Sequence, residues 1–132
     1  MKTTLFEASE SIGVLDKLGE QIFNGRLSLK ICDMLDAISK KSNFLDKEIR
    51  KIVEHYGATA MDPQNNDSRM VVKNADGSVN EEKTKEFIDK VIEIRKTEVD
   101  IDVEPFTMDD MDAIKLPTVE VFKIRWLINR DS

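Results

Sequence analysis

The sequence has little of what builds disulfides, long flexible segments or membrane spans. Its single cysteine, Cys32, excludes an intramolecular disulfide and fits a reducing compartment. Five glycines and three prolines in 132 residues argue against long disordered tracts, and the glycines form neither a GxGxxG nor a GxxxxGKS phosphate-binding motif. No apolar run approaches the roughly 18 residues of a membrane span, and the opening MKTTLFEASE has no apolar core of signal-peptide length. We therefore expect a cytoplasmic protein without nucleotide chemistry.

Charged residues are abundant, and the acidic ones prevail. The 26 Asp and Glu against 20 Lys and Arg give a net charge of −6, which disfavours direct binding to nucleic acid and to anionic membranes. We expect protein partners, and self-association stays open as an alternative. Hydrophobic residues make up 40% and charged residues 35% of a chain of single-domain length, so residues 1–132 should form one mainly helical domain.

One unbroken series of apolar residues at steps of four and three predicts a long helix with a narrow apolar side. The series consists of Ile31, Leu35, Ile38, Ser42, Leu45, Ile49, Ile52 and Tyr56. Ser28 is the expected N-cap, and Tyr56 with Gly57 should end the helix. Because a helix gains most of its stability by burying one face, this helix needs partners.

Two shorter helices are predicted as those partners. A helix over 7–22 should end at Asn24 in a left-handed cap, which leaves a short loop and an antiparallel helical hairpin. A third helix should begin at Asn80 or Ser78 and carry a second apolar stripe. Together the three helices predict a helical core over 7–96.

Two segments of this sequence are predicted to contain strands. Residues 58–78 are rich in Asn, Asp and other turn residues and predict a polar loop, with a brief strand at 70–73. Strict alternation of apolar and acidic residues over 97–103 predicts a strand with one buried face, which Pro105 ends. Because a lone strand is unstable, it should pair with 2–6 or with 70–73.

The C-terminal segment, 97–132, should add two helices after the acidic strand. Thr107 and Asp110 have the spacing of a capping box and predict a short acidic helix. Residues 118–129 are apolar nearly all round, so their periodicity fits a helix or a strand, and the preceding Pro117 favours a helix. The predicted fold is α+β, mainly α, with a three-helix core, a small sheet and a C-terminal helix.

Two surfaces stand out as candidates for partner binding. One is an acidic array formed by Glu98, Asp100, Asp102, Glu104, Asp109, Asp110 and Asp112. The other is the apolar C-terminal segment, where Phe122 and Trp126 are the candidate anchors, because aromatic residues dominate interface energetics. The acidic array could also hold Ca²⁺ or Mg²⁺, but side chains in line along a strand do not converge on one point.

The remaining reactive side chains are isolated. His55 lies at the predicted end of the long helix, where a charged imidazole complements the helix dipole, and neither an orienting carboxylate nor a nucleophile accompanies it in a recognisable pattern. Cys32 belongs to no Cys-His or CxxC motif and is expected to be a packing or surface residue. We therefore expect no enzymatic activity and no cofactor.

The order of segments resembles a group of small uncharacterised proteins encoded by bacteriophages and prophages of Gram-positive bacteria. The resemblance covers nearly the whole chain and is carried by KTTLFEAS, LSLKICDMLDAISKK, IVEHYG, TEVDIDVEPFTMDDMD and LPTVEVFKIRWLI. It implies a phage context and the cytoplasm of a host cell, and it supplies no catalytic residues.

These observations favour a non-enzymatic phage accessory or assembly protein that binds another protein through one or both candidate surfaces. An alternative is an inhibitor of a host defence protein that imitates nucleic acid with its carboxylate array. A metal-dependent enzyme is a third alternative, and it requires ligands gathered from separate segments.

Overall fold

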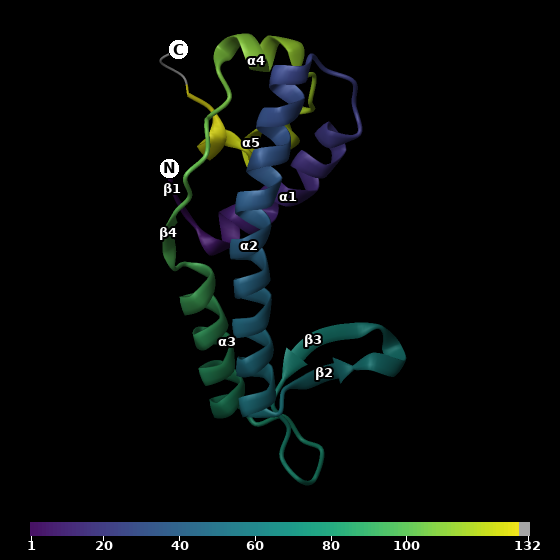
Figure 1. Ribbon diagram of the computed structural model, residues 1–132. Helices are drawn as coiled ribbons and strands as arrows, with labels where there is room; N and C mark the ends of the chain where they lie inside the picture. The colour runs from purple at the N-terminus through teal and green to yellow at the C-terminus, as the bar shows by residue number, and fades with distance from the viewer. Residues whose placement is uncertain (130–132) are drawn as a thin grey trace. The chain divides into compact units, whose positions relative to one another are not determined.

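A computed structural model describes residues 1–129 and confirms a mainly helical α+β fold (Figure 1). Contacts divide the chain into two compact units: unit 1 contains Met1–Asn43 and the segment from Thr97 onward, and unit 2 contains Phe44–Lys96. The sequence predicted one helical core over 7–96, whereas the buried side chains form two clusters, one in each unit. Within residues 1–129, no helix combines the length and the apolar character that crossing a bilayer requires.

The first two helices confirm the predicted hairpin but differ at its turn. Helix α1 (Leu5–Gly19) begins at Thr4, whose hydroxyl accepts a hydrogen bond from the Glu7 amide at 3.1 Å, and it ends before Ile22, which is fully exposed. Helix α2 (Gly25–Tyr56) is capped by Asn24, whose side chain accepts a hydrogen bond from the Leu27 amide at 2.9 Å. Asn24 therefore starts α2 and does not end α1, and the predicted cap at Ser28 is wrong.

The core of unit 1 is formed by α1, the first half of α2 and the C-terminal segment. Its fully enclosed side chains include Leu15, Leu18, Ile31, Met34, Ile38, Phe106, Ile124 and Leu127. Ser42, the one polar residue in the apolar series, shares a hydrogen bond of 2.8 Å with the Ser9 hydroxyl. The small side chains let α1 approach α2 closely at this point.

A two-stranded sheet joins the N-terminus to the segment after residue 96. Strand β1 (Lys2–Thr4) pairs antiparallel with β4 (Glu98–Asp100), with Thr3 opposite Val99. The predicted pairing with 2–6 is confirmed, and the alternative with 70–73 is wrong. The strand is shorter than predicted, but the alternation continues beyond it, because Ile101 is buried and Asp102 exposed.

The last elements of unit 1 are short helices. Helix α4 (Met108–Ala113) begins with the predicted capping box of Thr107 and Asp110. Residues 118–129 form helix α5 (Thr118–Lys123) followed by a 3-10 turn, η2 (Arg125–Leu127), so the helical prediction is confirmed only in part. The helix stops where Ile124 and Leu127 turn into the core and Ile128 pairs in parallel with Phe106.

Unit 2 begins with the second half of α2, which ends in a Schellman motif. Gly57 has a φ of +62°, and the amides of Gly57 and Ala58 donate to the carbonyls of Glu54 and Val53 at 3.3 and 3.0 Å. A left-handed glycine followed by an apolar contact is the usual stop for a helix, and Ala58 packs against Val53. The predicted end at Tyr56 and Gly57 is confirmed.

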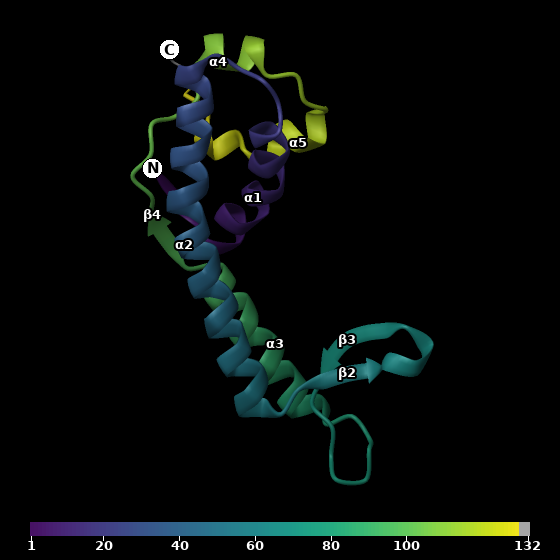
Figure 2. The same ribbon diagram turned by 45° about the vertical axis from the view of Figure 1, so that its right-hand side comes forward.

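The predicted polar loop over 58–78 is instead mostly a β-hairpin, and the brief strand predicted at 70–73 overlaps its second strand at Met70 and Val71. Strand β2 (Thr59–Asp62), a 3-10 turn, η1 (Pro63–Asn65), and β3 (Asp67–Val71) form an antiparallel pair beside the end of α2 (Figures 1 and 2). Its reversal uses Asn66 in the left-handed region, with a φ of 61°. Many residues here are polar because both strands are largely exposed.

Helix α3 (Glu81–Arg95) completes unit 2 and lies beside the second half of α2 in both views (Figures 1 and 2). Asn80 caps it by accepting from the Lys83 amide at 3.0 Å, which confirms one of the two predicted caps. Phe87 is the buried residue of its apolar stripe and contacts Tyr56 of α2 with ring centroids 6.1 Å apart.

Candidate functional site

The strand part of the acidic array lies on the surface of unit 1, and two of its members are paired within the protein. Asp100 accepts a hydrogen bond from the Met1 amino group at 2.8 Å, which holds the pKa of this carboxyl below its usual range. Glu104 lies 3.8 Å from the Lys30 ammonium and 3.9 Å from Arg26. Glu98 and Asp102 are exposed. The predicted array is therefore partly neutralised by the chain itself.

Asp110 belongs to a buried ion pair, a contact the sequence did not predict. The Lys30 side chain on α2 is only 2% exposed, and its ammonium donates to Asp110 at 2.7 Å and to the Pro105 carbonyl at 3.1 Å. Burial raises the pKa of Asp110, but hydrogen bonds from Lys30 and the Thr107 amide outweigh it, so the pKa is lowered overall. This half-buried carboxylate holds α4 on α2.

The other two acids of α4 remain available at the surface. Asp109 and Asp112 are exposed, and Asp112 follows Met108 by one helical turn. Met108 is exposed and Met111 is half-buried, so this short helix presents apolar and acidic side chains close together.

Methionines of α4 and residues of α5 and η2 surround an apolar groove of about 530 Å³, named the α4–α5 groove here. It is lined by Met108, Met111, Thr118, Val121, Phe122, Arg125 and Ile128. Phe122 is 62% exposed, and the Arg125 guanidinium lies over its ring at 3.8 Å from the centroid. Of the predicted partner-binding residues, Phe122 lines the groove, and the α4 side of the lining consists of methionines and not of the acidic array.

Trp126, the second predicted anchor, does not line the α4–α5 groove. It is half-buried and packs against the core of unit 1. Its buried indole N–H has no hydrogen-bond acceptor among residues 1–129. Of the two predicted anchors, Phe122 is the exposed one.

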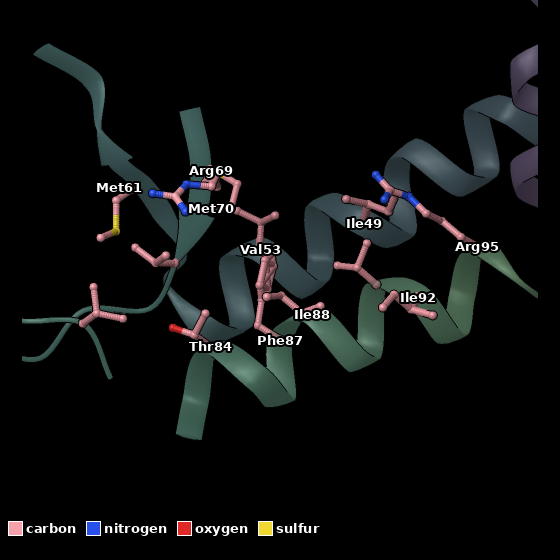
Figure 3. A pocket seen from close by; sticks show the side chains of 13 residues that line it. Ile49, Val53, Met61, Arg69, Met70, Thr84, Phe87, Ile88, Ile92 and Arg95 are labelled. Atoms are coloured by element: carbon pink, nitrogen blue, oxygen red, sulfur yellow. The ribbon is translucent and has the colours of Figure 1, made fainter. Parts of the chain in front are cut away.

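A second groove, which the sequence did not predict, lies in unit 2 between α2, α3 and the hairpin. It measures about 580 Å³ and is named the α2–α3 groove here. Figure 3 shows Val53 and Phe87 at its floor, with Ile88 and Ile92 along α3, Met61 and Met70 on the hairpin side, and Arg95 toward the other end. The sequence does contain a sign of this groove: two further apolar residues, Ile88 and Ile92, lie beside the main apolar stripe of the third helix.

The two isolated reactive residues both lie on α2. Cys32 is exposed on α2, and His55 contacts Tyr56 edge to face, with ring centroids 5.0 Å apart. Among residues 1–129, no three His, Cys, Asp or Glu side chains converge as a metal site would require.

We compared the chain with known protein families, curated proteins and solved structures. No family model, no curated protein and no solved structure matches the chain.

Proposed function

We propose that the protein is a non-enzymatic binding protein and that the α4–α5 groove receives a segment of another protein. The observation that supports this is the exposed Phe122 beside Met108 in one apolar groove. Exposed aromatic and methionine side chains that gather around a groove are typical of protein interfaces.

The partner segment should carry an apolar side chain flanked by basic residues. The groove supplies flexible methionines that adapt to an apolar anchor. Asp109 and Asp112 are exposed on the α4 side, where they would attract Lys or Arg at the rim of the contact. Arg125 already contacts Phe122 and lies 3.4 Å from the Glu7 carboxylate, so its charge is partly satisfied.

The phage context and the host cytoplasm belong to this proposal and rest on the sequence resemblance. The alternative of a nucleic-acid mimic is less well supported, because Asp100, Glu104 and Asp110 each have a cationic group of this chain nearby. A mimic would present its charges unpaired to a basic enzyme.

Affinity capture from phage-infected cells tests the proposal. The wild-type protein should retain a specific partner, and F122S combined with M108S should lower its recovery about tenfold or more, as expected for interface anchors. V119S is the matched control, because Val119 is an exposed apolar residue of α5 outside the groove. Retention of the partner by the double variant would show that the groove is not the binding surface.

The charge of the rim is tested on the same captured partner. D109N together with D112N should weaken binding and make it less sensitive to salt, because exposed charges act through a screened field. Binding that is unaffected by these changes and by salt would contradict a basic partner segment.

A further inference from the structure

Several large apolar side chains that line the α2–α3 groove are exposed in unit 2. Ile88 is 45% and Ile92 is 40% exposed, although both are large aliphatic residues near the middle of α3. Met61 and Met70 of the hairpin are also exposed and line the same groove. Contiguous exposed apolar patches of this kind mark interaction surfaces.

Two charges of opposite sign flank the apolar centre of this face. Glu81 precedes Ile88 by seven residues and Arg95 follows it by seven. At about 100° per residue, both lie within about 20° of Ile88 around the helix, so all three share one side of α3. Neither Glu81 nor Arg95 has an ion-pair partner among residues 1–129.

We propose that a second copy of the chain covers this groove, with the two α3 helices packed antiparallel across a two-fold axis beside Ile88. This surface is distinct from the α4–α5 groove, so the inference goes beyond the proposed function.

The charge pattern of α3 selects the antiparallel arrangement. When Ile88 lies next to its equivalent, Glu81 of each copy faces Arg95 of the other, which makes two identical ion pairs. The same symmetry sets Ile92 against Thr84 of the second copy, and both residues line the groove. A parallel pair would instead bring Glu81 to Glu81 and Arg95 to Arg95. A two-fold contact requires such self-complementarity, and α3 has it.

Four charged residues on the opposite side of α3 pair with one another within the helix. Lys83 pairs with Glu86 at 3.5 Å, and Lys90 pairs with Glu93 at 3.9 Å, each along the same helix. These four residues lie about 140–160° from Ile88 around the helix and satisfy one another within the chain. Glu82, Lys85 and Asp89 are also outside these ion pairs, but they lie about 60–120° from Ile88 around the helix. Glu81 and Arg95 are therefore the charges of α3 that lie nearest to the side of Ile88 and have no ion-pair partner among residues 1–129.

Sedimentation equilibrium of the full chain tests the dimer. The wild type should dimerise in the micromolar range, whereas I88E should be monomeric. E81K and R95E should each weaken self-association about tenfold, because each creates two like-charge contacts. An equimolar mixture of E81K and R95E should form heterodimers, since both contacts then join opposite charges.

D89K is the matched control for E81K, because it makes the same change from a negative to a positive charge at an exposed position of α3 about a quarter turn from Ile88. It should dimerise like the wild type. Circular dichroism of each variant identifies any that fails to fold, and the mixing experiment remains decisive if I88E is one of them. A wild type that stays monomeric, or charge variants that dimerise unchanged, would overturn the proposal.

Disulfide trapping tests the two-fold axis separately. In a C32S background, I88C should form a covalent dimer on mild oxidation, because residues beside a two-fold axis meet their own equivalents. D89C in the same background should remain largely monomeric. Equal cross-linking of the two variants would place the axis elsewhere and overturn the register.

Discussion

Lys30 puts an ammonium group inside unit 1, where Asp110 is its nearest carboxylate at 2.7 Å and the exposed Glu104 lies 3.8 Å away. The Lys30 side chain is nearly inaccessible, while that of Asp110 is 17% exposed. A buried charge whose partner is removed is strongly destabilising, because its lost hydration is no longer offset. The pair therefore makes the attachment of α4 to α2 sensitive to small changes at either residue.

Replacing Asp110 should lower the stability of the fold more than replacing Lys30. D110N keeps an acceptor for the Thr107 amide but leaves the Lys30 charge without a carboxylate at 2.7 Å, so it should lower the free energy of unfolding by about 3 kcal/mol. K30M should cost less than half as much, because Asp110 keeps its contact with water and with Thr107. Urea denaturation of both variants measures the difference, and equal losses would contradict this asymmetry.

The same pair should add a pH dependence that D110N removes. The pKa of Asp110 in the folded protein lies below its ordinary value of 3.8. Its contribution to stability is therefore complete above pH 3.8 and is lost as the pH falls through the lower folded pKa. Urea midpoints measured across acid pH should converge for wild type and D110N, and a constant difference would contradict this prediction.

Among the elements, the turn between α1 and α2 shows how a correct pattern can be assigned to the wrong helix. Asn followed by Gly is typical both of a left-handed helix end and of a helix start. Asn24 caps α2 because its side chain reaches the Leu27 amide, and α1 has already ended at Gly19. The choice depends on where the chain turns, which local sequence does not determine.

Side-chain replacement distinguishes the two caps. N24A should lower the free energy of unfolding by about 1 kcal/mol, because the first turn of α2 loses its acceptor. S28A, at the position that the sequence favoured, should change stability by less than about 0.5 kcal/mol, since Ser28 is an exposed residue inside the helix. Thermal denaturation of both variants checks the order, and a larger loss for S28A would contradict it.

Elements whose signals are local could be predicted, and those that depend on distant contacts could not. The capping boundaries at Asn80, Thr107 and Gly57 follow from neighbouring residues and were found. Only a brief strand of the hairpin was predicted, because both of its strands are mostly exposed and lack a strong apolar alternation. Asp110 seemed part of an acidic surface because Lys30 lies 80 residues earlier in the chain. The α2–α3 groove likewise requires knowing which side of α3 meets α2.

For the whole molecule, the two units differ sharply in how much apolar surface they enclose. Counted over residues 1–129, the core cluster of unit 1 has thirteen buried residues, whereas that of unit 2 has three, Ala58, Val72 and Phe87. Local stability follows the number of enclosed apolar contacts. Unit 2 should therefore unfold locally more readily than unit 1 when the protein is monomeric.

Hydrogen exchange compares the units on helices of equal length. α1 and α3 each have 15 residues, but α1 buries six of them and α3 only one. In dilute solution, amides in the middle of α3 should exchange about tenfold faster or more than those of α1. Mass spectrometry of peptide fragments measures both rates in one sample, and equal protection would contradict the prediction.

The pairing of Thr3 with Val99 has a consequence for biosynthesis. Residues near the start of the chain have no strand to pair with until nearly a hundred residues have been translated, and Leu127 must then arrive to fill the same core. Phe44–Lys96 is continuous and can assemble while the ribosome is still working. The better-packed unit is thus the later one to be completed, and the nascent chain exposes Leu15 and Ile31 to chaperones until then.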